Sequence, residues 1–190
     1  DFSTPLRPDN PIPYVNQKGV VTRDLTPKES YYVFQSYWTS KPMAHIYGYT
    51  WPVRWGAAGK NELFKVYSNC PEAELFVNGK SYGVKKRNSQ DFPAAGLRWE
   101  VPLQEGDYSV RVVARDGKAV VTDSIRFHYQ TASWGKPVKL LLKAVATRGD
   151  TTTVEATAVD ASGVQCLDAA DFVRFSAAGG ATLLDDLGTP

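Results

Sequence analysis

Acidic side chains are the first residues of this sequence that could do chemistry, because two carboxylates on either side of a glycosidic bond can hydrolyse it. Glu72 and Glu74 lie two residues apart at the start of a predicted strand, on one face that we interpret as a solvated edge. Asp107 and Asp116 bound another predicted strand, and the acidic pair at 185–186 is typical of a turn. The acids are scattered, so we assign no catalytic residue within this chain.

Nucleophiles and metal ligands give no stronger signal. His45 and His128 each lie in a predicted strand without a Ser or Cys elbow beside them, which favours structural roles. Cys70 and Cys166 are far apart, and neither has a second Cys or a His at metal-ligand spacing. We predict no metal site and no cofactor. A disulfide would require the two segments to meet, so two buried free thiols are the simpler expectation.

One polar segment could bind a ligand. Asn16-Gln17-Lys18-Gly19 lies in a proline-rich loop that covers residues 1–25. An amide and an ammonium two residues apart can grip a carboxylate or sugar hydroxyls. The alternative is a solvated turn, because Asn and Gly both favour turns. The residues alone leave both interpretations open.

The elements that would position these side chains are one helix and many strands. Thr26-Pro27-Lys28-Glu29 predicts a capped helix start, and Pro42 ends the helix. An aromatic stripe at helical spacing follows the start: Tyr31, Phe34, Tyr37 and Trp38. So large an apolar face must pack against another element, and we expect that partner to lie outside this chain.

Short strands with regular turn signals follow from Met43. Asn78-Gly79 is a strong hairpin signal, and Asp116-Gly117 marks a second reversal. About seven strands of this kind predict an immunoglobulin-like sandwich. After a linker at 130–137, further strands are expected at 138–147, 151–160 and 171–177. Too few residues remain for a second sandwich of roughly 100 residues.

Composition excludes several classes of protein. Of the 190 residues, Lys and Arg number 22 and Asp and Glu number 20, so no basic field predicts binding to nucleic acid or an anionic membrane. Hydrophobic residues make up 43% and charged residues 22%, as in a globular protein. No apolar run approaches the roughly 20 residues of a membrane-spanning helix. The chain opens on Asp1 without an initiator methionine, so we expect a processed chain or a piece of a longer protein.

Three stretches together resemble one enzyme family. They are the loop and helix run of residues 1–38, the Asn-Gly hairpin region of 66–83, and residues 153–163. The stretches resemble family 2 glycoside hydrolases, the β-galactosidase and β-glucuronidase family. The resemblance implies that residues 1–42 are the last loop and helix of a (β/α)8 catalytic barrel. It further implies an Ig-like β-sandwich at 43–130 and a truncated second Ig-like domain at 131–190, so the expected fold class is mainly β.

The resemblance also implies an activity. Members are retaining exo-β-glycosidases with two catalytic glutamates on earlier barrel strands, and no position here matches either motif. In the β-glucuronidase branch an Asn-x-Lys motif binds the uronic acid carboxylate, and Asn16 and Lys18 match that motif. The implied partners are a carbohydrate substrate and the N-terminal catalytic part of the same protein. A bacterial protein in the periplasm or outside the cell is the location that the resemblance favours.

A different class of protein stays open beside this one. The chain could be a carbohydrate-binding module without catalytic activity, in which Trp51, Trp55 and Trp99 lie at the surface and stack on sugar rings. It could equally be a structural spacer in which these side chains are buried. The exposure of the three tryptophans separates these alternatives.

Overall fold

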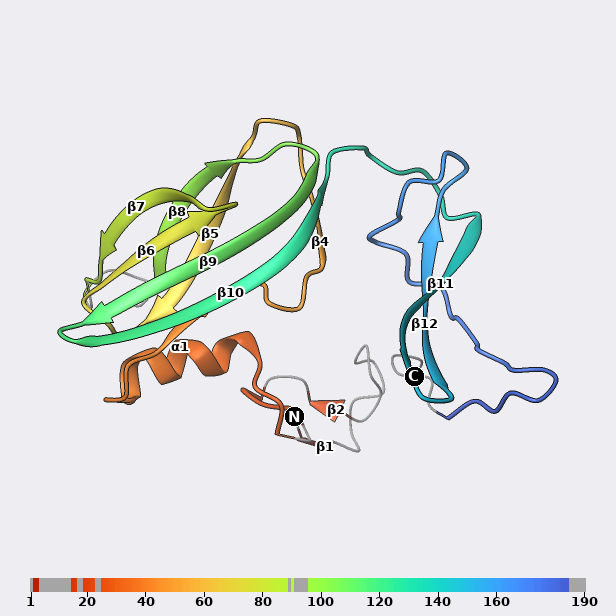
Figure 1. Cartoon of the computed structure of the whole chain (residues 1–190), viewed down its shortest axis with the longest axis horizontal. Coiled ribbons are helices and arrows are strands. Elements are labelled where there is room, and N and C mark those ends of the chain that lie inside the picture. The colour runs from red at the N-terminus through yellow and green to blue at the C-terminus, as the bar shows by residue number, and fades with distance from the viewer. Residues whose placement is uncertain are drawn as a thin grey trace. The chain divides into compact units, whose positions relative to one another are not determined.

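Strands dominate this chain, and one helix is present among the described residues (Figure 1). The computed structural model describes residues 2–3, 15–16, 19–22, 25–88, 90 and 96–184. They divide into two compact units, Asp1–Thr131 and Ala132–Pro190. Within the described ranges, no helix is long and apolar enough to cross a membrane. The mainly β class predicted from the sequence is confirmed.

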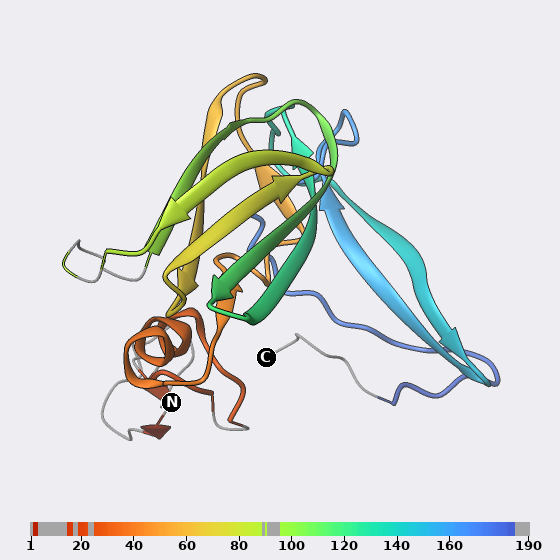
Figure 2. The same cartoon turned by 60° about the vertical axis from the view of Figure 1, so that its left-hand side comes forward.

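Two sheets enclose the core of the first unit (Figures 1 and 2). The larger has the order β4 (Val53–Trp55), β10 (Ala119–Gln130), β9 (Gly106–Asp116), β6 (Glu72–Val77) and β7 (Lys80–Lys86). The smaller has the order β3 (Ala44–Ile46), β5 (Asn61–Ser68) and β8 (Gly96–Pro102). Neighbouring strands are antiparallel except for β4 and β10. This two-layer arrangement is the predicted β-sandwich.

Alternating burial fixes which face of each strand meets the core. In β6, Ala73, Leu75 and Val77 are buried, and the residues between them are less so. Successive side chains of a strand point to opposite faces, so this alternation places three apolar groups on one side. There they join Phe64 of β5 and Val112 of β9 in a single apolar cluster.

The β6–β7 turn confirms the predicted hairpin. Asn78 and Gly79 have φ angles of 48° and 81°, and Val77 pairs with Lys80 across the two-residue loop. Both central residues of such a turn need positive φ, which Asn and Gly tolerate best. Asn78 Oδ1 also accepts a hydrogen bond from Ser109 N at 2.8 Å. The turn is thus attached to β9 as well.

Two strands differ from the sequence prediction. Val53–Trp55 was expected to be part of a turn, yet it forms β4 and pairs parallel with β10, with Val53 opposite His128. β10 itself is one long strand where two short ones were predicted. Its ladder with β9 continues without a break through Asp123 and Ser124. Pairing with β9 therefore overrides the polar interruption in the sequence of β10.

The helix α1 (Glu29–Trp38) lies at one end of the sandwich (Figures 1 and 2). Its predicted start is wrong by two residues, because Pro27 forms a β-bridge with Val21 instead of entering the helix. Lys28 occupies the N-cap position, and no side chain bonds to the helix start there. The glutamate expected to close a capping box binds elsewhere, as described below.

The two faces of α1 have different surroundings. Ser36 is buried, and its hydroxyl donates a hydrogen bond to Val33 O at 2.6 Å. Phe34 and Tyr37 are about two-fifths exposed, and Trp38 is 80% exposed. Most of the predicted aromatic stripe therefore does not pack against the sandwich in this chain.

The second unit is built on one hairpin. β11 (Lys139–Arg148) pairs antiparallel with β12 (Thr151–Val159), with an irregularity between Ala144 and Ala146. The strand predicted at 171–177 is wrong, since that segment has no ladder with another described strand. Cys70 in the first unit and Cys166 in the second are both buried and free, as expected.

Candidate functional site

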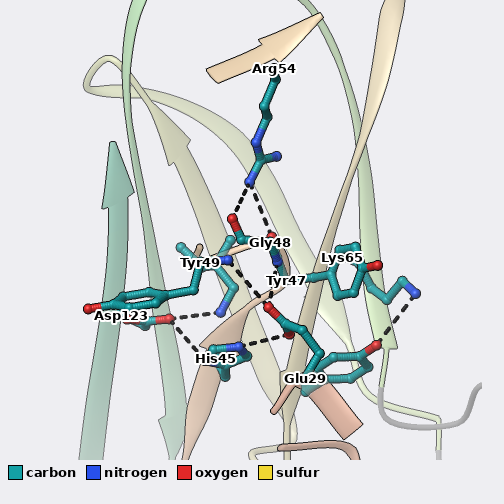
Figure 3. Close-up of polar contacts among 10 residues, drawn as sticks. Glu29, His45, Tyr47, Gly48, Tyr49, Arg54, Lys65 and Asp123 are labelled. Atoms are coloured by element: carbon teal, nitrogen blue, oxygen red, sulfur yellow. Dashed lines mark hydrogen bonds and ion pairs between the residues drawn. The ribbon is translucent and has the colours of Figure 1, made fainter. Parts of the chain in front are cut away.

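A carboxylate from α1 binds the sandwich through three contacts (Figure 3). Glu29 Oε2 lies 3.0 Å from His45 Nε2. Glu29 Oε1 accepts hydrogen bonds from Gly48 N at 2.8 Å and Tyr49 N at 3.3 Å. Bonds to a charged acceptor are among the stronger ones in proteins. The first residue of α1 is thus attached to β3 and to the turn that follows it.

His45 is held on several sides. Its ring is 6% exposed and stacks on Tyr32 of α1, with centroids 3.5 Å apart and planes 6° from parallel. Its Nδ1 lies 3.9 Å from Asp123 Oδ2 of β10. The same Asp123 oxygen accepts a bond from Ile46 N at 2.8 Å. Burial, followed by Glu29 and Asp123, raises the pKa of Tyr32.

Arg54 of β4 fixes the other side of the same turn. Its Nη2 donates to Tyr47 O at 3.3 Å and to Gly48 O at 3.2 Å (Figure 3). The guanidinium lies over the ring of Phe127, 4.4 Å from its centroid. Burial lowers the pKa of Arg54, and Glu29 opposes that effect. We call Glu29, His45, Arg54 and Asp123, with the turn 47–49, the α1 joint.

The α1 joint was missed at the sequence level. Glu29 was assigned to a helix cap and His45 to a strand, and nothing linked them. The Asp123 carboxylate bonds an amide 77 residues away in sequence, so no local pattern could have revealed the contact. The groups of the joint bond to one another, which makes it a fastening for α1.

The two residues predicted to bind substrate are only partly described. Asn16 lies in β2 (Val15–Asn16), which pairs antiparallel with β1 (Phe2–Ser3). Asn16 is paired with Phe2 in that register. Lys18 lies outside the described residues. The role of Asn16 and Lys18 in binding a carboxylate therefore stays a prediction.

The segment between these residues and α1 is closed by backbone hydrogen bonds. Lys28 N donates to Val20 O at 3.0 Å, and Val21 forms its β-bridge with Pro27. Thr22 N donates to Thr26 O at 3.0 Å. The chain therefore returns to residue 20 immediately before α1 begins.

A second histidine lies between two acids at the far end of β10. His128 Nδ1 is 2.8 Å from Asp107 Oδ1, and its Nε2 is 3.1 Å from Glu105 Oε1. Glu105 Oε2 also accepts bonds from the amide and the hydroxyl of Thr131 at 2.5 Å. The hydrogen bond to Asp107 is the main cause that raises the pKa of His128. Its side chain remains 43% exposed.

The tryptophans divide between core and surface. Trp99 is 3% exposed, and its Nε1 donates to Gly83 O at 2.9 Å, so its expected place at the surface is wrong. Its strand alternation turns it into the core. Trp51 and Trp55 are 47% and 50% exposed. Of the acids weighed as a pair, Glu74 accepts a bond from Ser81 Oγ at 2.6 Å within the β6–β7 hairpin.

Comparison with known proteins identifies the class of protein. A family described as a domain of unknown function (DUF4982) matches residues 59–121. The whole chain is 44% identical over 191 residues to a putative beta-glucuronidase from Formosa agariphila, and covers 23% of it. It is 31% identical over 166 residues to a beta-galactosidase from Bacteroides ovatus, covering 85% of this chain and 18% of that protein.

A solved structure agrees with this match. The apo structure of Bacteroides uniformis beta-glucuronidase 3 is 65% identical, with a TM-score of 0.81. The match covers 89% of this chain and 22% of that chain. The β-sandwich with its attached helix is therefore the C-terminal region of a glycosidase. The chain belongs to the family 2 glycoside hydrolases, and spans less than a quarter of the relatives it matches.

Proposed function

We propose that this chain is the C-terminal region of a retaining exo-β-glucuronidase that removes terminal β-linked uronic acids from glycans. The observation that carries the proposal is the 65% identity to Bacteroides uniformis beta-glucuronidase 3. Asn16 and Lys18 support it, because they match the motif that binds a uronic acid carboxylate in the family. Relatives named for galactosides and for glucuronides both match the chain, so the substrate needs a direct test.

The proposed division of labour follows from the chemistry. Two glutamates in the part of the protein outside this chain would act as nucleophile and acid/base, as in other retaining glycosidases. The ammonium of Lys18 and the amide of Asn16 would donate hydrogen bonds to the carboxylate of the sugar. Neither residue would take part in breaking the bond. This chain would thus contribute selectivity for the substrate.

We further propose that the chain divides functionally at residues 42 and 130. Residues 1–42 would complete the catalytic barrel, 43–130 would be a whole Ig-like domain, and 131–190 would begin another. The exposed aromatic face of α1 supports the first assignment, since such a face needs an apolar partner. The compact unit ending at Thr131 supports the second boundary.

Lys18→Ala in the full-length enzyme tests the proposed substrate. We expect kcat/KM on 4-nitrophenyl β-glucuronide to fall roughly ten- to a hundredfold, the effect of losing one charge-assisted bond. Activity on the matching β-galactoside should change little, because that sugar has no carboxylate. Lys85→Ala, an exposed lysine on β7, is the matched control. Equal losses on both substrates would contradict the proposal.

A further inference from the structure

The start of α1 is positioned by the sandwich and not by a local cap. Glu29 is the first residue of the helix, and Lys28 before it makes no side-chain cap bond. The Glu29 carboxylate instead accepts bonds from the turn at Gly48 and Tyr49 and contacts His45. Where the helix begins in space therefore depends on β3 and its turn.

That turn is itself tightly held. Arg54 binds two of its carbonyl groups, and Asp123 binds the amide of Ile46 just before it. Gly48 has a φ of 81°, and a Cβ there would lie 2.9 Å from the Trp51 ring and from Arg54 Nη2. A larger residue would be strained and crowded. The turn thus offers Glu29 a rigid receptor.

The same contact extends back toward Lys18. The bond from Lys28 N to Val20 O joins the residue before Glu29 to one that lies only two positions after Lys18. The bridge between Val21 and Pro27 supports this closure. A displacement of Glu29 would therefore move Val20, and with it the segment that carries the predicted carboxylate-binding residues.

We infer that Glu29, held by His45 and the turn at Gly48, is a positioning residue for Asn16 and Lys18. Through it, the Ig-like sandwich sets the place of the groups that recognise the uronic acid. This inference rests on the proposed function. It goes beyond fastening the helix, because it assigns the sandwich a measurable part in substrate affinity.

Glu29→Ala in the full-length enzyme is the test. Misplacing a binding group by a fraction of an ångström should raise KM for 4-nitrophenyl β-glucuronide about tenfold, with kcat changed less than about threefold. KM for the matching β-galactoside should change less than about twofold, since no carboxylate is bound there. Glu29→Gln keeps the Oε1 acceptor for Gly48 and Tyr49, so its KM should return most of the way to that of the wild type.

Glu62→Ala is the matched control. Glu62 is a half-buried carboxylate whose contacts with Lys60 and Tyr129 lie within the sandwich. Its loss should lower the unfolding temperature without raising KM selectively. If Glu29→Ala leaves KM unchanged, weakens both substrates equally, or matches Glu62→Ala, the α1 joint is a fastening only and the inference is overturned.

Two further outcomes separate the claims. Where Glu29→Ala does not fold, Glu29→Gln carries the test, with a KM increase of about threefold expected and an unchanged KM overturning the inference. A selective loss in Lys18→Ala without one in the Glu29 variants overturns only the positioning role. The absence of a selective loss in Lys18→Ala overturns the proposed function itself.

Discussion

Single polar residues in this sandwich take their properties from neighbours that are distant in sequence. His128 lies between Asp107 and Glu105, both more than 20 residues away along the chain. These acids favour the imidazolium form, and the hydrogen bond to Asp107 is the larger cause of the raised pKa of His128. Folding therefore strengthens proton binding at this residue.

We expect His128 to make the stability of the chain depend on pH. Because its pKa is raised in the folded state, its contribution is fully present below the unfolded pKa of about 6.5. The contribution is lost as the pH rises through the higher folded pKa. Urea unfolding of the wild type and His128→Gln at several pH values should show a difference in stability that shrinks across this window. A difference that grows with pH would contradict the assignment.

At this scale the sequence predicted residue types better than residue partners. It identified Asn16 and Lys18 through a motif, and it assigned no catalytic role to either histidine. It could not find the contact of Glu29 with His45, since the glutamate also matched a local capping pattern. Trp99 was misplaced for a related reason: an aromatic side chain suits a core and a sugar-binding surface equally well.

Elements of the sandwich are stabilised according to their place in the sheet. β9 is the central strand of its sheet, and Val112 on it is fully buried. β7 lies at the edge, and Val84 on it is 52% exposed. The same residue type therefore has very different surroundings on two strands of one sheet.

Val112→Ala should lower the free energy of unfolding by about 2 kcal/mol, through lost burial and the cavity left behind. Val84→Ala, the matched change on the edge strand, should cost less than about 0.5 kcal/mol. Chemical denaturation of the two variants beside the wild type measures both values. Equal losses would mean that the sheet order does not govern stability at these positions.

Strands with alternating residues were predicted well, and pairing decided the rest. The β6–β7 hairpin followed from Asn78-Gly79, whose backbone preference is local. β4 was missed because three residues after Pro52 carry no strand pattern of their own and are ordered by β10. The strand expected at 171–177 failed for the opposite reason, since a suitable sequence found no partner among the described strands.

The whole chain combines a complete sandwich with surfaces that call for further partners. The core of the first unit joins residues of both sheets in one cluster. By contrast, α1 exposes Trp38, and every residue of β11 is exposed. The chain also spans less than a quarter of its relatives. A folded core can thus exist here without the parts that would complete a glycosidase.

This combination leads to a prediction for the 190-residue chain by itself. We expect it to fold, with a β-type circular dichroism spectrum and cooperative unfolding, because the sandwich core lies within one unit. We expect no release of 4-nitrophenol from β-glucuronides or β-galactosides, because no residue here matches the family's catalytic glutamates. The full-length enzyme at equal molarity is the positive control, and Lys18→Ala in that enzyme shows that the assay detects a partial loss. Turnover by the purified chain above the buffer rate would require a catalytic site within these residues and would overturn the assignment of catalysis to the rest of the protein.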